Sequence, residues 1–253
     1  MNKNKEFKVY MKTVNLFGIK MALGKKSELV RLASKLVGVG GVIFTPNLQI
    51  LAVADKNSEY KKILNTSSLN IPDSVGVKYL LAVGGEKTDV LPGVELGEAL
   101  VFGHSFAIIG GRAGRAERAG QNLCKKHRGA RFLFSFSGYG YDEQQIKEKL
   151  RLCKPDICIV CLGVLKQELF IERVRSASPK TLYLALGGSV DVYSGFVKRA
   201  PTAFRHLGLE WLYRALREPK RIRRLPRQLA FFLREFFTVL NKKERCLASK
   251  ISK

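Results

Sequence analysis

The chain has 253 residues, 46% of them hydrophobic, and its 45 Lys and Arg against 21 Asp and Glu give a formal net charge of +24 at pH 7. The length suits one large α/β domain with an appendage, or two small domains, and the hydrophobic content excludes wholesale disorder. So much positive charge favours a polyanionic partner: a nucleic acid, an acidic lipid surface or a phosphorylated substrate. The first 35 residues already hold nine Lys and Arg against two Glu, which is also what a general compositional bias would produce.

Neither a membrane-spanning helix nor a secretory signal is predicted. No apolar run reaches about 18 residues, and residues 229–240 are interrupted by Arg234 and Glu235. The lysine-rich N-terminus lacks both an apolar core and a small-residue cleavage site. Cys158 and Cys161 form a C-x-x-C inside an apolar run, and no second ligand pair stands at zinc-site spacing. We therefore expect buried reduced thiols, no metal site and a cytosolic protein.

Apolar strand-like runs alternate with helical patterns over the first 200 residues, which predicts an α/β fold with a mostly parallel sheet flanked by helices. Strands are expected at residues 41–45, 69–71, 105–110, 131–137, 156–162 and 181–186. Helices are expected at residues 25–37, 48–54, 58–64, 74–83, 113–127, 143–152 and 166–175. Several strands end in glycine or a polar turn, as expected where the carboxyl edge of a sheet meets a ligand.

The composition changes near residues 201–208, where strand-like runs stop and basic helical sequence begins. Thirteen Lys and Arg stand against four Glu from His206 to the C-terminus. Apolar residues recur there at helical spacing, which gives one apolar and one cationic face; they are Leu207, Trp211, Leu212, Ala215 and Leu216. Such a helix either packs on its own domain or lies on an anionic membrane, where each cation contributes about 1 kcal/mol. We predict an α/β domain in residues 1–205 and a basic helical appendage in residues 206–253.

Polar residues follow two of the expected strands. Thr45 and Asn47 stand at one carboxyl edge, where they can hydrogen-bond a sugar or simply cap the next helix. Asp73 lies in the loop after a short apolar run. It suits a general base in a cleft, although an Asp just before a helix is more often an N-cap.

A strand, a glycine-rich turn and a helix start coincide at Gly110, Gly111 and Arg112. Glycines there let backbone N–H groups approach a phosphate at a helix N-terminus. The segment is not a G-x-G-x-x-G, and no acidic ribose partner follows about 20 residues on. A tight βα turn without a ligand is equally consistent with it.

Two further strand ends carry polar groups. Gln167 lies between a cation and an anion where the next helix opens, and the last strand leads into Gly187, Gly188 and Asp191.

The order of these motifs resembles the WecG/TagA/CpsF family of bacterial glycosyltransferases over residues 14–224. The matching motifs are, in chain order, Thr-Pro-Asn, Pro-Asp-x-x-Gly, Gly-Gly-x-x-Gly, Lys-Gln-Glu, Gly-Gly-x-x-Asp, Lys-Arg-Ala-Pro and Gly-Leu-Glu-Trp-Leu-Tyr-Arg. Residues 197–219 form the most specific block. The resemblance implies a Rossmann-like α/β core with a basic helical C-terminal appendage.

The resemblance also implies an activity. Members transfer an N-acetylhexosamine, typically N-acetylmannosamine, from UDP to undecaprenyl-diphosphate-linked N-acetylglucosamine, with inversion and without a metal or other cofactor. They act peripherally at the inner face of the plasma membrane, in the synthesis of polysaccharides such as teichoic acid. The implied partners are a UDP-N-acetylhexosamine, the lipid-linked acceptor, an anionic membrane surface and possibly further copies of the chain, with no specific nucleic acid.

The family's proposed roles map onto this sequence residue by residue. Asp73 matches the general base, and Thr45, Asn47 and Gln167 match residues of the substrate pocket. Arginine forks suit diphosphate oxygens, and the appendage offers several. The remaining candidates for substrate binding are Gly110, Gly111, Arg112, Gly187, Gly188, Asp191, Arg214, Arg217, Arg221 and Arg224.

Three blocks depart from the family pattern. Ser74 replaces the Gly after the base, Val90 and Glu95 replace an Arg and an Asp, and Leu165 replaces a Pro. These changes suit either a redirected donor or acceptor specificity or an inactive relative that only binds sugar nucleotides. A nucleic-acid-binding protein is the third alternative, but interleaved aromatic and basic residues for base stacking are absent from the sequence.

Overall fold

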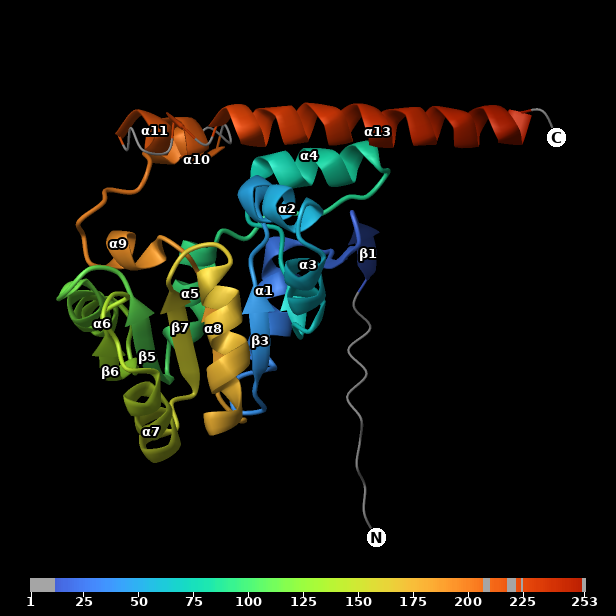
Figure 1. Ribbon diagram of the computed structural model, residues 1–253. Helices are drawn as coiled ribbons and strands as arrows, with labels where there is room; N and C mark the ends of the chain where they lie inside the picture. The colour runs from blue at the N-terminus through green and yellow to red at the C-terminus, as the bar shows by residue number, and fades with distance from the viewer. Residues whose placement is uncertain (1–11, 207–209, 218–221, 224, 252–253) are drawn as a thin grey trace, which may run out of the picture.

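A six-stranded parallel sheet forms the centre of the molecule. The computed structural model describes residues 12–206, 210–217, 222–223 and 225–251 (Figure 1). From one edge to the other the sheet runs β4 (Leu69–Asn70), β3 (Gly41–Phe44), β8 (Leu182–Ala185), β7 (Ile157–Cys161), β5 (Ser105–Gly110) and β6 (Arg131–Phe136). Every pairing in it is parallel. The expected α/β fold is confirmed, and each of the six expected strands is present to within one residue at either end.

Helices cover both faces of this sheet. One face is covered by α1 (Lys26–Ser34), α5 (Gly93–Val101), α6 (Arg115–Lys126) and α9 (Ser189–Tyr193). The other face is covered by α2 (Leu48–Asp55), α3 (Ser58–Asn65), α4 (Val75–Val83), α7 (Glu143–Cys153) and α8 (Lys166–Val174), which the short η1 (Arg175–Ala177) continues. Strand residues alternate between the two resulting cores, as the two-residue period of a strand requires.

This alternation places the two cysteines of the C-x-x-C on opposite faces of the sheet. Cys158 joins the core on one face of β7 and Cys161 the core on the other, so the two thiols point away from each other. Both cysteines are free and buried, as predicted. Burial raises the pKa of the Cys161 thiol to about 12, which keeps it protonated at neutral pH.

A strand hairpin and two helices of the α/β domain were not predicted. An antiparallel hairpin, β1 (Thr13–Leu16) and β2 (Ile19–Ala22), precedes the sheet. Its turn residues Phe17 and Gly18 have φ of 54° and 82°, and Gly18 N–H donates to the Asn15 side chain at 2.7 Å. Positive φ at both positions suits a tight hairpin, but Phe is not a sequence signal for such a turn. The missed helices are α5, between two predicted segments, and the short α9, which follows the last strand.

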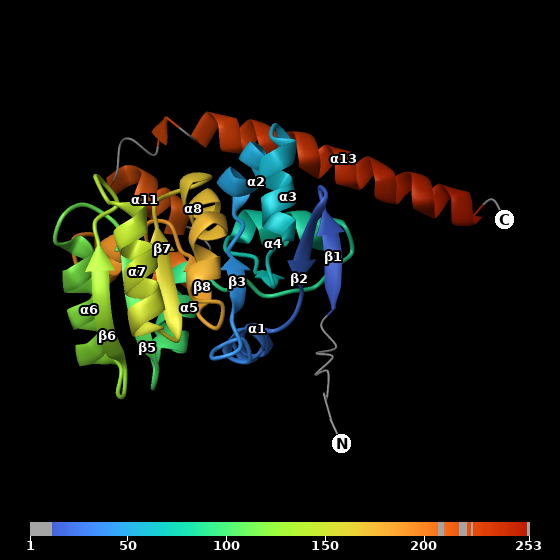
Figure 2. The ribbon, with the colours of Figure 1, turned by 60° about the horizontal axis from the view of Figure 1, so that its bottom comes forward.

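The C-terminal part lies at the end of the sheet toward which the strand arrows point (Figure 1). It comprises α10 (Thr202–His206), α11 (Glu210–Arg217) and the long α13 (Leu225–Ile251). In Figures 1 and 2, α13 crosses α2 and α4 and then extends beyond them. Phe231, 6% exposed, packs edge-on against Phe17, and Arg234 pairs with Asp55 at 2.7 Å. The first half of α13 therefore belongs to the packing of the core, while the domain boundary expected near residue 206 stays a prediction.

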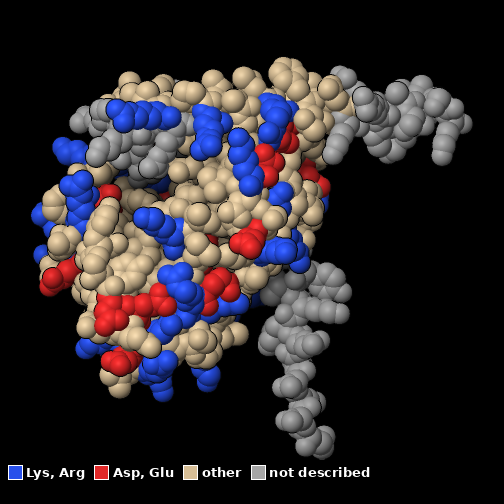
Figure 3. Space-filling view, in the orientation of Figure 1, with Lys and Arg blue, Asp and Glu red and all other residues tan. Residues whose placement is uncertain are grey.

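On the face of the molecule that Figure 3 shows, positive charge is distributed rather than concentrated. Figure 3 shows Lys and Arg side chains over much of one face of the molecule, as the even spread of charge along the sequence predicts. Within the described ranges, no helix combines the length and apolarity needed to cross a bilayer.

Asp156 fixes the amino end of β5. Its Oδ2 accepts hydrogen bonds from the Ser105 N–H at 2.8 Å and the Ser105 hydroxyl at 2.7 Å. Partial burial raises the pKa of this carboxyl, but the two hydrogen bonds together lower it by more. The pKa of Asp156 therefore lies below its ordinary value. The ionised form is therefore favoured by folding.

This contact predicts a specific acid sensitivity. Because the pKa of Asp156 is lower in the folded state, its contribution is complete above the unfolded-state pKa, about 4, and is lost as pH falls through the lower folded-state value. In Asp156→Asn the free energy of unfolding should be lower at pH 7 and should fall less steeply below about pH 4. Urea denaturation from pH 7 to pH 3 measures both. Glu148→Gln, at an exposed carboxylate, is the control; a variant with the wild-type pH slope would contradict the assignment.

Candidate functional site

Polar residues from three neighbouring strands meet at the carboxyl edge of the sheet. Thr45 directly follows β3, Asp73 follows β4 and Gly187 follows β8, and these three strands lie side by side. Thr45 is 5% exposed, and its hydroxyl donates to the Ala185 carbonyl at 3.2 Å. The threonine is thereby fixed across the gap between β3 and β8.

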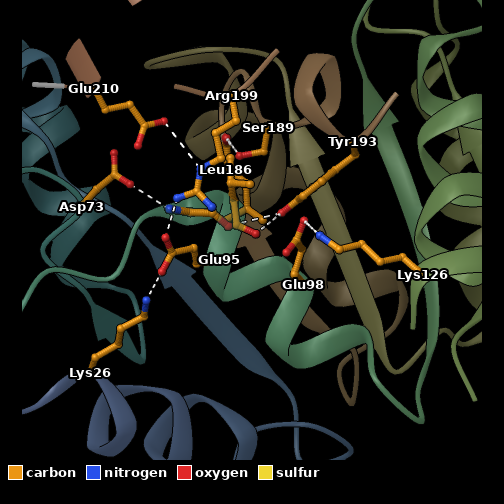
Figure 4. A network of polar contacts seen from close by, with 12 residues as sticks. Lys26, Asp73, Glu95, Glu98, Lys126, Leu186, Ser189, Tyr193, Arg199 and Glu210 are labelled. Carbon is orange, nitrogen blue, oxygen red and sulfur yellow. Dashed lines mark hydrogen bonds and ion pairs between the residues drawn. The ribbon is translucent and has the colours of Figure 1, made fainter. Parts of the chain in front are cut away.

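Asp73 lies beside Asn47, and the N-cap position of α4 is occupied by Ser74. Its Oδ1 accepts from the Gly93 N–H at 2.7 Å, at the first residue of α5 (Figure 4). Its Oδ2 accepts from the Asn47 Nδ2 at 3.3 Å. The N-terminus of α5 favours a negative charge at this point, and the two hydrogen bonds hold the carboxylate in one orientation.

Asn47 has two roles at once. Its Oδ1 accepts from the N–H groups of Gln49 and Ile50 at 3.0 and 3.1 Å and so caps α2. Its Nδ2 is directed to Asp73 by that same capping geometry. The capping and the site interpretations of this residue are therefore compatible.

Gln167 connects the start of α8 to the turn after β8. Its Oε1 accepts from the Gly187 N–H at 2.9 Å, and its Nε2 donates to Glu168 Oε1 at 2.9 Å. Glu168 has no exposed surface, and burial raises the pKa of its carboxyl. Sequence reasoning saw Glu168 only as part of a motif; nothing in the sequence marked it as buried.

The close approach of β7 requires a glycine in the turn after β5. Gly110 has φ of +137°, and a Cβ there would lie 2.2 Å from the Cys161 carbonyl oxygen. The Gly111 N–H donates to that oxygen at 3.3 Å, so this amide is already engaged within the chain. Arg112 is exposed beside the turn, and α6 begins three residues later at Arg115.

Asp191 lies in α9, next to the start of α6. Its Oδ1 accepts from Arg115 Nη1 at 2.5 Å. The Phe196 ring lies 4.6 Å from the Arg115 guanidinium and 5.3 Å from that of Arg118. Asp191 and its neighbour Gly188 are thus part of a cationic corner between α6 and α9, separate from the group around Asp73.

The appendage arginines are placed only in part. The backbone of α11 carries Arg214 and Arg217, whereas Arg221 and Arg224 lie outside the described residues. A cavity of about 510 Å³ opens between α5, α6, α9 and the segment after α9. Thr45, Asp73 and Gln167 are not among the residues that line it.

The departures from the family pattern have local structural consequences. Ser74 has φ of −133°, so this backbone does not need the freedom of a glycine there. Leu165 has φ of +72° and ψ of −46°, which a proline ring cannot adopt. The loop before α8 must therefore differ from one built on proline. At the third departure, Glu95 accepts hydrogen bonds from both Lys26 and Arg199.

Leu165 provides a test of backbone strain at the site. A side chain with a Cβ at this positive φ costs about 1–2 kcal/mol, whereas glycine adopts it freely. Leu165→Gly and Leu165→Ala remove the same packing but differ in that strain. We expect the glycine variant to be more stable by about 1 kcal/mol in chemical denaturation, after the greater entropy of unfolded glycine is allowed for. Equal stabilities, or the usual preference for alanine, would show that the loop is unstrained.

Comparison with known proteins bears on this arrangement. The model of a family described as "Glycosyl transferase WecG/TagA/CpsF family" matches residues 14–245. Two curated relatives, from Bacillus spizizenii W23 and Bacillus subtilis 168, are both named N-acetylglucosaminyldiphosphoundecaprenol N-acetyl-beta-D-mannosaminyltransferase. The first is 30% identical over 222 residues, which is 83% of this chain and 82% of the relative. The second is 30% identical over 194 residues, 74% of this chain and 75% of the relative.

Proposed function

Because this chain belongs to the WecG/TagA/CpsF family of glycosyltransferases, we propose that it moves N-acetylmannosamine from UDP onto N-acetylglucosamine carried by undecaprenyl diphosphate. Its two relatives are named for transfer of this sugar to this acceptor. The observation that carries the proposal is the Asp73 carboxylate, held at the carboxyl edge of the sheet by Gly93 and Asn47.

In the proposed reaction, Asp73 accepts the proton of an acceptor hydroxyl as that oxygen attacks the anomeric carbon of the donor sugar. The bond from this carbon to the UDP oxygen breaks, UDP leaves with the bonding electrons, and attack from the opposite side inverts the anomeric centre. Thr45, Asn47 and Gln167 border the sugar. Arginines of the appendage, rather than a metal ion or cofactor, stabilise the negative charge that develops on departing UDP.

Asp73→Asn tests the base directly. The amide keeps an oxygen for the Gly93 N–H but cannot take a proton, so we expect UDP release to fall by about 10²–10⁴-fold with the fold unchanged. UDP is measured with UDP-N-acetylmannosamine and a short polyprenyl-diphosphate N-acetylglucosamine in liposomes. Asp142→Asn is the matched control, because asparagine caps α7 as well as aspartate does.

The outcomes separate the alternatives. A wild-type rate in Asp73→Asn would contradict the base assignment. A folded wild-type protein that binds UDP-sugars but releases no UDP with any UDP-N-acetylhexosamine would favour the inactive sugar-nucleotide-binding relative.

We further propose that the protein binds peripherally to the inner face of the plasma membrane through α13. Three apolar side chains recur at four-residue spacing on its outer face: Leu229, Leu233 and Phe237 are 58%, 45% and 56% exposed. Arg223 and Arg227 are exposed near the start of the helix. An apolar stripe with cations beside it is typical of a helix that lies in the interface of an anionic bilayer. This helix lies on the side of the molecule toward which the strands point (Figure 1).

Replacing Leu229, Leu233 and Phe237 together by Ser should reduce binding to vesicles that contain phosphatidylglycerol by more than about tenfold, since each apolar side chain contributes roughly 1–2 kcal/mol on insertion. Vesicle sedimentation measures the partition. Leu152→Ser removes a leucine 78% exposed on α7, far from α13 in Figure 1, and should leave binding unchanged. Equal losses in both variants would contradict the assignment to α13.

A further inference from the structure

We propose that Arg199 is a positioning residue, which fixes the first turn of α11 against the turn of α5 that holds Asp73. This inference deepens the proposed transferase function and rests on it. Figure 4 shows the arrangement: Arg199 lies between Glu95 and Glu210, and Asp73 lies beside the same group. Glu95 is in the first turn of α5, and Glu210 is the first residue of α11.

The guanidinium joins the core to the appendage. Arg199 Nη2 lies 2.5 Å from Glu95 Oε1, and its Nε lies 3.8 Å from Glu210 Oε1. The side chain is 19% exposed, and the next residue, Ala200, is buried. Its Nε–H is buried and makes no hydrogen bond. The Glu210 carboxylate, 3.8 Å away, balances the charge of the guanidinium at this position. At this exposure the pair is less screened than one on the surface.

Glu95 can hold this arginine because it stays ionised. Partial burial raises the pKa of its carboxyl. Hydrogen bonds from Lys26 and Arg199, together with the charges of both cations, lower that pKa by more, so it lies below its ordinary value. Lys26, the first residue of α1, thus anchors the carboxylate from the core side while Arg199 anchors it from the appendage side.

The first turn of α5 connects Glu95, which contacts Arg199, to Gly93, which contacts Asp73. Gly93 and Glu95 are two residues apart in that turn, and Gly93 N–H donates to the Asp73 carboxylate. The Tyr193 hydroxyl, buried under the turn, donates to the Val94 carbonyl at 2.8 Å. The turn is therefore stiff, and one rigid unit carries both the proposed base and the acceptor for Arg199.

The chemical consequence follows from what α11 carries. Arg214 and Arg217 belong to that helix, so the placement of its first turn sets how its cations approach the departing diphosphate. A misplaced α11 weakens transition-state stabilisation without removing the donor-binding residues at the carboxyl edge. Loss of Arg199 should therefore lower kcat with the lipid acceptor and change donor affinity much less.

Amide hydrogen exchange on the full chain tests the contact without relying on activity. In Arg199→Gln and in Glu210→Gln, exchange of the amides in residues 210–217 should be about fivefold faster than in the wild type, the effect of losing one partly buried ion pair. Exchange in the double variant should be no faster than in Arg199→Gln, because the arginine substitution already removes the pair with Glu210. Lys198→Gln, at the exposed neighbouring cation, should leave exchange unchanged. Unchanged exchange in Arg199→Gln would overturn the proposal.

Kinetics test its consequence. With UDP-N-acetylmannosamine and the liposomal acceptor, Arg199→Gln should lower kcat by roughly tenfold to a hundredfold. UDP dissociation constants from calorimetry should rise much less than kcat falls, because the charge that α11 stabilises is largest as the bond to UDP breaks. Arg199→Lys, which keeps the charge but not the planar fork, should restore part of the rate. An unchanged kcat, or an equal loss of UDP affinity, would overturn the positioning role. A wild-type protein without transferase activity would instead refute the proposed function, and the exchange experiment would still decide the contact.

Discussion

Burial of the parallel sheet on both faces is the constraint on which the site depends. Every strand of this sheet is parallel to its neighbours, so successive strands are joined by crossover connections, whose helices cover both faces. All carboxyl ends therefore meet at one edge. Thr45 and Ala185, which are 140 residues apart, come into hydrogen-bond contact there. The same geometry brings Asp73 beside Asn47, so the polar group follows from strand order rather than from any local motif.

Carboxylates in so cationic a chain are mostly held by arginine and lysine. Asp191 pairs with Arg115, and Glu95 is held by two cations. The Asp73 carboxylate accepts hydrogen bonds from amides at Gly93 and Asn47. Amide donors orient a carboxylate and support its ionised form, yet they leave it able to accept a proton. These amides therefore orient the carboxylate that we propose as the base.

Sequence periodicity located every strand of the main sheet, because buried parallel strands are continuous apolar runs. It missed α5 because glycines at positions 93 and 97 argue against a helix. The structure needs the second glycine for packing: a Cβ on Gly97 would lie 2.3 Å from the Tyr193 hydroxyl. With α5 missed, the Gly93 contact to Asp73 and the Glu95 contact to Arg199 could not be foreseen. The residues of the site were legible from motif order, whereas their partners depend on tertiary packing.

The C-terminal segment has two attachments of different kinds. The first half of α13 is held to the core by apolar packing, since Phe231 is buried and Arg234 pairs with Asp55. The link through Arg199 to the start of α11 is ionic, with Glu210 3.8 Å from the guanidinium. Removing every residue beyond about position 208 would uncover the hydrophobic core as well as remove the appendage arginines, so loss of activity in such a truncation would not separate folding from catalysis. Substitutions at the ionic link leave the apolar attachment intact, and they can therefore isolate what α11 contributes to the reaction.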